Sequence, residues 1–153
     1  MFPDFNFDEA LETIEQVNIE QSDSIILGRV FIYSFIGNKA RVIIENGKPK
    51  EAKTIKEKVM MYAQMLLRTE LYKYNVYKDT EFGMTYFNYR GNRMLPSGFI
   101  NSELKREIEE KLMRLSVVDS ISDFSAKMNG TVLNAEFTIN LNDNSSVSIS
   151  EVI

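Results

Sequence analysis

The last third of the chain limits its fold most, because apolar and polar residues alternate there with a period of two. Residues 131–141 place five apolar side chains on one face: Leu133, Ala135, Phe137, Ile139 and Leu141. Residues 145–152 alternate serines with Val147 and Ile149. This alternation is typical of half-buried antiparallel strands. Turn signals at Asn129-Gly130 and at residues 142–144 separate these segments from each other and from residues 117–128. The sequence therefore predicts a three-stranded β-meander.

Two amphipathic helices are predicted upstream of this meander. The first begins at Thr54, which has capping-box spacing to Glu57. Its apolar stripe follows helical spacing and consists of Ile55, Val59, Tyr62, Met65 and Leu66. The stripe of the second helix consists of Ile100, Leu104, Ile108, Leu112 and Leu115. In the second helix, Glu107 and Lys111, and likewise Glu110 and Arg114, have the spacing of stabilising ion pairs.

Residues 25–45 are rich in β-branched residues, and Gly37-Asn38 offers a turn between them. We therefore expect an N-terminal β-hairpin there. Residues 1–24 mix phenylalanines with acidic residues, and they are either a solvated tail or an extended arm that docks its phenylalanines on a partner. The fold class expected is α+β, with two helices packed on a small antiparallel meander. The domains expected are an arm over residues 1–24 and one α+β domain over residues 25–153.

The absence of histidine and cysteine excludes imidazole bases, thiolate nucleophiles, disulfides and the common zinc and iron sites. The net charge is −4, and no cluster of Lys and Arg forms the basic face that nucleic acid requires. No stretch approaches the ~20 apolar residues that span a bilayer. The first residues also lack the pattern of a secretory signal. We expect no cofactor, no metal, no nucleic acid and no membrane among its partners.

Seven aromatic residues gather between residues 72 and 89, a density that fits a contact surface, although several of them will be core. Three carboxylates lie in or just before this segment, on Glu70, Asp79 and Glu81. Two carboxylates flanking a sugar can hydrolyse a glycosidic bond, so a muramidase-like hydrolase is one hypothesis. The other interpretation is that these acids are ion-paired, for example Glu70 with Arg68 or a neighbouring lysine.

The strand predicted over residues 145–152 has no later segment to pair with, so we place it at an edge of the sheet. Its sequence lacks the lysine and proline with which natural edge strands are usually blunted. An edge of this kind can accept a strand from another chain. The alternative is a short, polar and merely exposed strand, and a third hypothesis for the whole chain is a generic dimerising α+β domain.

Several segments, in their order along the chain, resemble the small, lysozyme-like baseplate wedge proteins of contractile phage tails. The segments are residues 55–70 with Ile55, Tyr62 and Leu66, the aromatic residues 72–77, and residues 81–84, 101–108 and 120–124. The similarity covers residues 46–153, and it is to the sheath initiators encoded in tail operons of Gram-positive prophages. It implies a structural protein, present in several copies around the tail tube, with sheath, tube and wedge proteins as partners.

The resemblance also implies which residues make contacts. The sheath-binding edge maps onto Ser146, Val147, Ser148, Ile149, Ser150, Glu151 and Val152. Contacts with baseplate and tube are expected from Phe2, Phe5, Phe7, Arg68, Glu70, Tyr72, Tyr74 and Arg114. Relatives carry a Glu-Pro-Arg motif after the second helix, thought to serve contacts within the baseplate core, where this chain reads Leu115-Ser116-Val117. The contact of that motif is therefore not expected in the same form, and another charged residue, such as Arg114, can take it over. The expected location is the baseplate of a virion or bacteriocin-like particle, assembled in the host cytoplasm.

Overall fold

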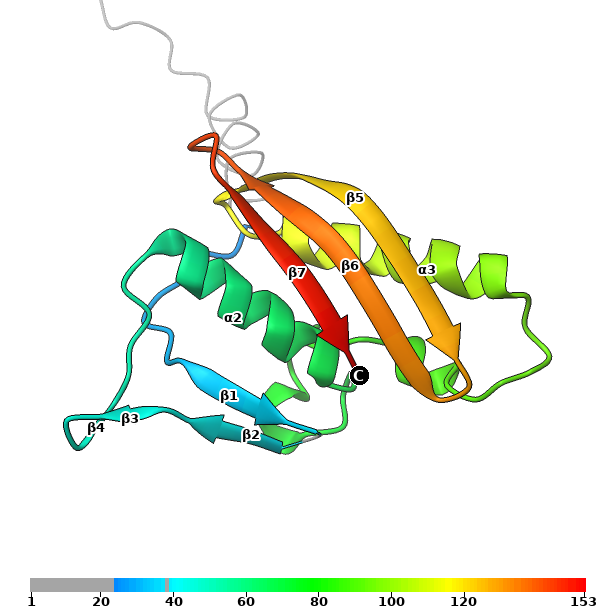
Figure 1. The fold of residues 1–153 in the computed structure, drawn as a ribbon, viewed down its shortest axis with the longest axis horizontal. Helices are drawn as coiled ribbons and strands as arrows, with labels where there is room; N and C mark the ends of the chain where they lie inside the picture. Colours follow the sequence, from blue (N-terminus) through cyan, green and yellow to red (C-terminus); the bar gives the residue numbers. More distant parts are fainter. Residues whose placement is uncertain (1–23, 38) are drawn as a thin grey trace, which may run out of the picture.

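The computed structural model describes residues 24–37 and 39–153. Two small hairpins come first, β1 (Tyr33–Ile36) with β2 (Lys39–Val42), and β3 (Ile44–Glu45) with β4 (Lys48–Pro49). Helix α2 (Ile55–Arg68) and helix α3 (Ser97–Met113) follow, separated by two short 3-10 turns, η1 (Asn75–Tyr77) and η2 (Tyr86–Asn88). The chain closes with β5 (Val118–Asn129), β6 (Val132–Leu141) and β7 (Ser146–Val152). This is the α+β architecture expected (Figure 1).

The three C-terminal strands form one antiparallel sheet in the order β5-β6-β7, which confirms the meander. All five predicted apolar residues of β6 are buried, and the residues between them are exposed or half-buried. The first turn differs by one residue from the predicted Asn129-Gly130, because Asn129 pairs with Val132 and the loop is Gly130-Thr131. Gly130 has a φ of 63° there, a conformation that glycine adopts without strain.

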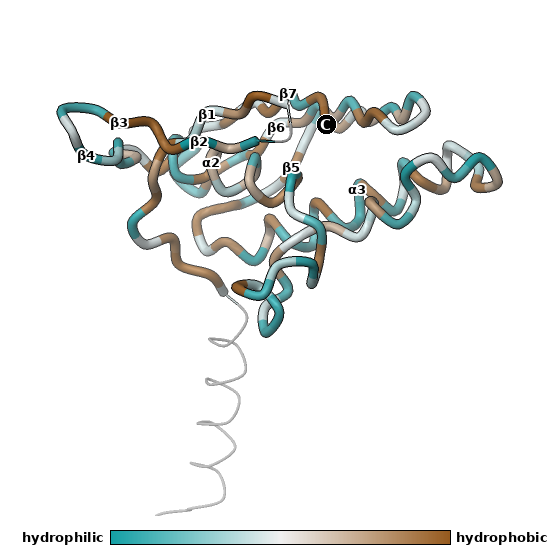
Figure 2. Tube along the Cα trace, turned by 90° about the horizontal axis from the view of Figure 1, so that it is seen from below, coloured by the Kyte–Doolittle hydropathy of each residue, from teal (hydrophilic) through white to brown (hydrophobic). Residues whose placement is uncertain are grey.

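Both helices pack on one face of this sheet, α3 against β5 and α2 against β7 (Figure 1). The capping box of α2 is present, since the backbone N–H of Glu57 donates to Thr54 Oγ1 at 3.2 Å. Helix α3 begins at Ser97, three residues before Ile100, the first residue of its predicted stripe. Its predicted stripe is buried, and hydrophobic and hydrophilic residues alternate along it in Figure 2. Arg106, rather than Arg114, pairs with Glu110.

Helix α2 buries a wider face than its predicted stripe, because it lies between the sheet and the β1–β2 hairpin. Val59 and Leu66 are buried as expected, and Met61, Ala63 and Leu67 join them. On the hairpin side, the backbone N–H of Tyr33 donates to Met61 Sδ at 3.4 Å. Ile55, at the first helical position, stays about half exposed at 49%. The hairpin therefore packs against the helix.

The loop between the helices is fastened by a close approach of two backbone segments at Gly83. Leu71 N donates to Met84 O at 3.1 Å, and Met84 N donates to Thr69 O at 2.8 Å. A Cβ on Gly83 would lie 2.9 Å from the Leu71 backbone, and Gly83 has a φ of +125°. Only glycine fits such a position without strain. Met84 and Tyr86 are buried beyond it, and Tyr86 Oη donates to Leu67 O at 3.0 Å.

Candidate functional site

Strand β7 lies at an edge of the sheet, as expected, and among the described residues no strand pairs with its outer side. Leu133 and Ile153 exchange two backbone hydrogen bonds of 2.8 Å at the end of the β6–β7 ladder. Because paired residues in an antiparallel ladder alternate between bonded and non-bonded pairs, Val147, Ile149 and Glu151 direct their backbone groups toward β6. The intervening residues, Ser146, Ser148, Ser150 and Val152, direct theirs outward.

Side-chain burial divides β7 in the same way. Val147, Ile149 and Glu151 are buried, whereas the four residues with outward backbone groups have exposed side chains. The serines and Val152 therefore combine free N–H and C=O groups with solvent-facing side chains. Substituting one of these residues leaves both the ladder to β6 and the core in place.

The opposite edge of the sheet is irregular. The pairing of β5 with β6 shifts register between Val118 and Ser120 and again between Ser122 and Ser125. Asp123, within the second irregularity, has a φ of 53°. Bulges of this kind bend a strand and discourage pairing at an edge. By contrast, β7 keeps one register over all seven of its residues.

Strand β7 is anchored to α2 by a buried polar cluster at its end. The Glu151 carboxylate is 7% exposed, forms an ion pair with Arg68, and accepts a hydrogen bond from Gln64 Nε2 at 2.6 Å. The Arg68 guanidinium also lies over the Phe35 ring, 4.6 Å from its centroid, and donates to Gly37 O at 3.3 Å. Arg68 therefore joins the last turn of α2 to both β7 and the β1–β2 hairpin.

Sequence reasoning placed Glu151 and Arg68 on contact surfaces and missed that they pair with each other. It also missed Glu107, a buried carboxylate of α3 that accepts hydrogen bonds from Thr85 N at 2.8 Å and Thr85 Oγ1 at 3.0 Å. The break in apolar alternation at Glu151 was the available signal, since a carboxylate on a buried strand face requires a partner.

The other expected contact residues fall into different environments. Tyr72 and Tyr74 are exposed, at 55% and 49%. Tyr72 also has a φ of 61°, a left-handed conformation that is rare for a bulky residue. Arg114 forms an ion pair with Glu81. Phe2, Phe5 and Phe7 lie outside the described residues.

The three carboxylates of the hydrolase hypothesis are not brought together in one recess. Glu70 pairs with Lys73 at 2.8 Å, as the lysine form of the ion-pairing interpretation expected. Glu81 lines an apolar groove that neither Glu70 nor Asp79 lines. Among the described residues, no group of three or more acidic side chains is arranged to hold a metal ion. No helix in the described part is long and apolar enough to cross a membrane.

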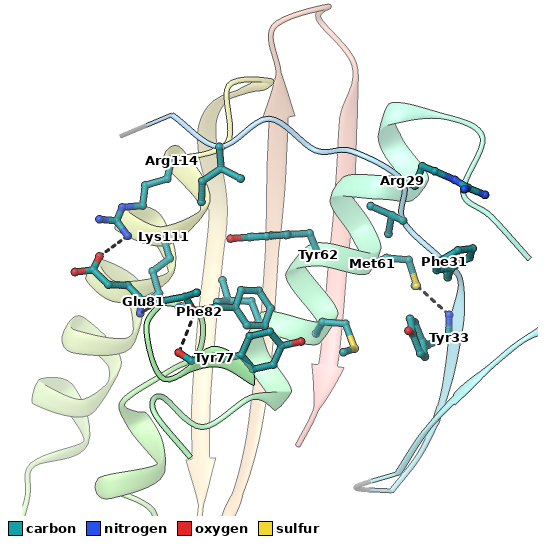
Figure 3. Close-up of a pocket in the computed structure, with 15 residues that line it drawn as sticks. Arg29, Phe31, Tyr33, Met61, Tyr62, Tyr77, Glu81, Phe82, Lys111 and Arg114 are labelled. Atoms are coloured by element: carbon teal, nitrogen blue, oxygen red, sulfur yellow. Dashed lines mark hydrogen bonds and ion pairs between the residues drawn. The ribbon is translucent and has the colours of Figure 1, made fainter. Parts of the chain in front are cut away.

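That groove has a predominantly apolar lining and a volume of about 500 Å³. It lies between α2, residues 25–33 and the loop of residues 77–82 (Figure 3). Tyr62, Tyr77 and Phe82 form its aromatic wall, with ring centroids 5.3 Å apart for Tyr62 and Phe82 and 4.8 Å apart for Tyr77 and Phe82. Burial raises the pKa of Tyr62, and burial lowers the pKa of Lys111 at the rim.

Comparison with protein families gives a match to the family described as the contractile injection system sheath initiator. The match covers residues 33–144, from β1 through β6, and ends just before β7. Searches of curated proteins and of solved structures gave no match. Because the matched region is well over half of the chain, this protein belongs to the sheath initiator family of contractile injection systems.

Proposed function

We propose that β7 is the surface on which this protein begins the sheath, by accepting a strand from a sheath subunit. Membership of the family supports a role in sheath initiation at the tail. The observation that carries the finer proposal is the regular outer edge of β7, with four residues whose N–H and C=O groups point away from β6. A strand added there gains a ladder of backbone hydrogen bonds, each worth about 1 kcal/mol net.

The proposal extends to the neighbours of the protein. Tyr72 and Tyr74 are exposed aromatic side chains, the type enriched at protein interfaces. The strained backbone of Tyr72 supports a contact role, since such strain is concentrated at functional positions. Together with Glu70, Arg68, Arg114 and the arm that carries Phe2, Phe5 and Phe7, these residues would face tube and wedge proteins. Several copies would surround the tube in a baseplate assembled in the host cytoplasm.

Deleting residues 145–153 is a poor test, because it also removes Val147 and Ile149 from the core. The sharper test is Ser148→Pro, which removes an N–H that points away from β6. Proline is tolerated at edge positions of this kind. The matched control is Ser148→Thr, which alters the same side chain and keeps the N–H. Ile149→Pro is the opposite control, since it removes a donor to β6 and should unfold the sheet.

Particles assembled with each variant are to be examined by electron microscopy, after thermal melting has shown that the variant folds. We expect Ser148→Pro to give tubes with baseplates and without sheaths, while Ser148→Thr gives full-length sheaths. A folded Ser148→Pro protein that still starts normal sheaths would refute strand addition at β7.

The competing function is a muramidase-like hydrolase using Glu70 with Asp79 or Glu81. Its test is clearance of peptidoglycan by the purified protein, with Glu70→Gln as the inactive variant. Clearance that is lost in Glu70→Gln would favour the hydrolase. We propose the structural role because Glu70 is tied to Lys73 and does not share the Glu81 groove.

A further inference from the structure

The apolar groove beside α2 has the lining and the volume of a binding site. Its floor and walls carry aromatic and thioether side chains, including Phe31, Met61, Met65, Tyr77 and Phe82 (Figure 3). Its volume of about 500 Å³ is within the range of pockets that bind ligands. The groove has no role in the proposed strand addition, because no residue of β7 lines it.

Three basic residues lie at the rim of the groove. Arg29, Lys111 and Arg114 line it, and Glu81 is the one acidic residue that does. Arg29 and Arg114 are each ion-paired, to Glu51 and Glu81. The Lys111 ammonium donates to Glu81 O at 2.8 Å and is 3.9 Å from the Glu107 carboxylate. Each of the three cations therefore has a carboxylate partner within the protein, and the apolar lining is the feature that an occupant has to match.

The chain enters the described structure at the wall of this groove. Ile25 lines the groove and is fixed by two backbone hydrogen bonds, from its N–H to Arg114 O and from Ser116 N to its carbonyl, at 2.6 and 3.0 Å. Residues 1–23 are therefore tethered at the edge of the recess. A tether of this kind gives the segment an effective concentration in the millimolar range.

The composition of residues 1–23 complements the groove. They carry seven of the 22 acidic residues and none of the 18 basic ones, a formal charge of −7 against +3 for the rest of the chain. Their first seven residues include Phe2, Phe5 and Phe7, with Asp4 and Asp8 alongside. Phe7 is 18 residues from Ile25, a span of up to ~60 Å when extended, so chain length does not prevent the return.

We propose that, in the free protein, the phenylalanines of residues 2–7 occupy this groove of their own chain. The acidic arm, with a formal charge of −7, then lies against a body with a formal charge of +3. A second copy is the weaker occupant, because its arm must compete with one that is already attached at the groove. The consequence for assembly is that contacts of these phenylalanines with baseplate neighbours require an exchange, in which the arm leaves its own groove first.

The test uses the full chain, which contains no tryptophan, so that Phe5→Trp introduces a single fluorescent reporter. Phe2→Trp and Phe7→Trp give two more. Emission wavelength and acrylamide quenching report whether each indole is covered. We expect a blue-shifted and protected indole at one or more of these positions, unchanged on dilution.

Each reporter is then combined with a substitution in the body of the protein. Met65→Glu places a carboxylate on the groove wall, and Thr80→Glu places one at the exposed rim, where folding is not at risk. The matched control is Met94→Glu, because Met94 is 92% exposed and does not line the groove. We expect quenching to rise several-fold with the two groove variants and to stay constant with the control.

Three outcomes would overturn the proposal. The first is an indole that is fully quenched at all three arm positions. The second is protection that neither groove variant reduces, which would place the arm elsewhere. The third is protection that is lost on dilution, which would assign the groove to the arm of a second copy. None of these outcomes depends on sheath assembly, so the proposed function stands or falls separately.

Discussion

The ion pair between Arg68 and Glu151 gives a stability prediction that follows directly from burial. The side chains are 19% and 7% exposed, so each charge is largely removed from water. Removing one partner of a buried pair costs about 3–5 kcal/mol, because the remaining charge is left without compensation. For a domain stable by about 5–15 kcal/mol, this is a large fraction of the free energy of unfolding.

The two single substitutions should not be equivalent. Arg68→Met leaves a carboxylate that only Gln64 contacts, so we expect the full loss of about 3–5 kcal/mol. Glu151→Met leaves a guanidinium that retains Gly37 O, the Phe35 ring and partial exposure. We expect a smaller loss of about 2–3 kcal/mol for that variant. The double variant replaces both charges by apolar side chains and should lie within about 1 kcal/mol of the wild type.

Urea or guanidinium unfolding, followed by circular dichroism, measures all four free energies of a double-mutant cycle. The coupling energy expected is at or above the upper end of the usual range for contacting residues, which is about 0.5–3 kcal/mol. Additive losses in the double variant would refute the reasoning, since they would mean that the two charges do not compensate each other. A loss for Glu151→Met larger than for Arg68→Met would refute the assigned asymmetry.

Three further predictions concern the loop between the helices. Burial raises the pKa of Tyr86 to about 12, so its contribution to stability is complete below pH ~10 and is lost as the pH rises to ~12. Tyr86→Phe, which loses the bond to Leu67 O, should therefore be about 1 kcal/mol less stable at pH 8, and the gap should close in alkaline unfolding curves. Gly83→Ala should lower the melting temperature by at least several degrees, because of the φ of +125° and the contact with Leu71; an unchanged midpoint would contradict this. Tyr72→Gly should stabilise the isolated protein by up to about 1 kcal/mol by relieving the left-handed backbone, yet weaken its incorporation into baseplates.

Local patterns were enough to predict the two long helices and the C-terminal meander. The period of two in residues 131–152 determined which face of the meander is buried, because a one-residue shift would expose every apolar side chain. The edge position of the last strand was predicted because no later segment could pair with it. The capping box located the start of α2 to the residue. The short β3–β4 hairpin was not predicted, because its strands of two residues each are too short to show a period.

The side-chain pairings that define the candidate site were beyond local patterns. Arg68 and Glu151 are 83 residues apart, and Thr85 and Glu107 are 22 apart. Neither pairing has a periodic signature. The groove likewise depends on where residues 25–33 return to α2, which the sequence does not specify. The sequence thus identified the edge strand, and the β6–β7 pairing in the structure was needed to show which of its amides point away from β6.

The register shifts of β5 have a consequence for a sheath that starts on this sheet. Under the proposed function, chains can be appended on one flank only, since the other is kinked at Asp123. If strands can be added at the β7 edge only, the polymer that starts on this protein grows in one direction. Two copies of the protein also cannot join through their β5 edges. The bulges of β5 would then make sheath growth vectorial.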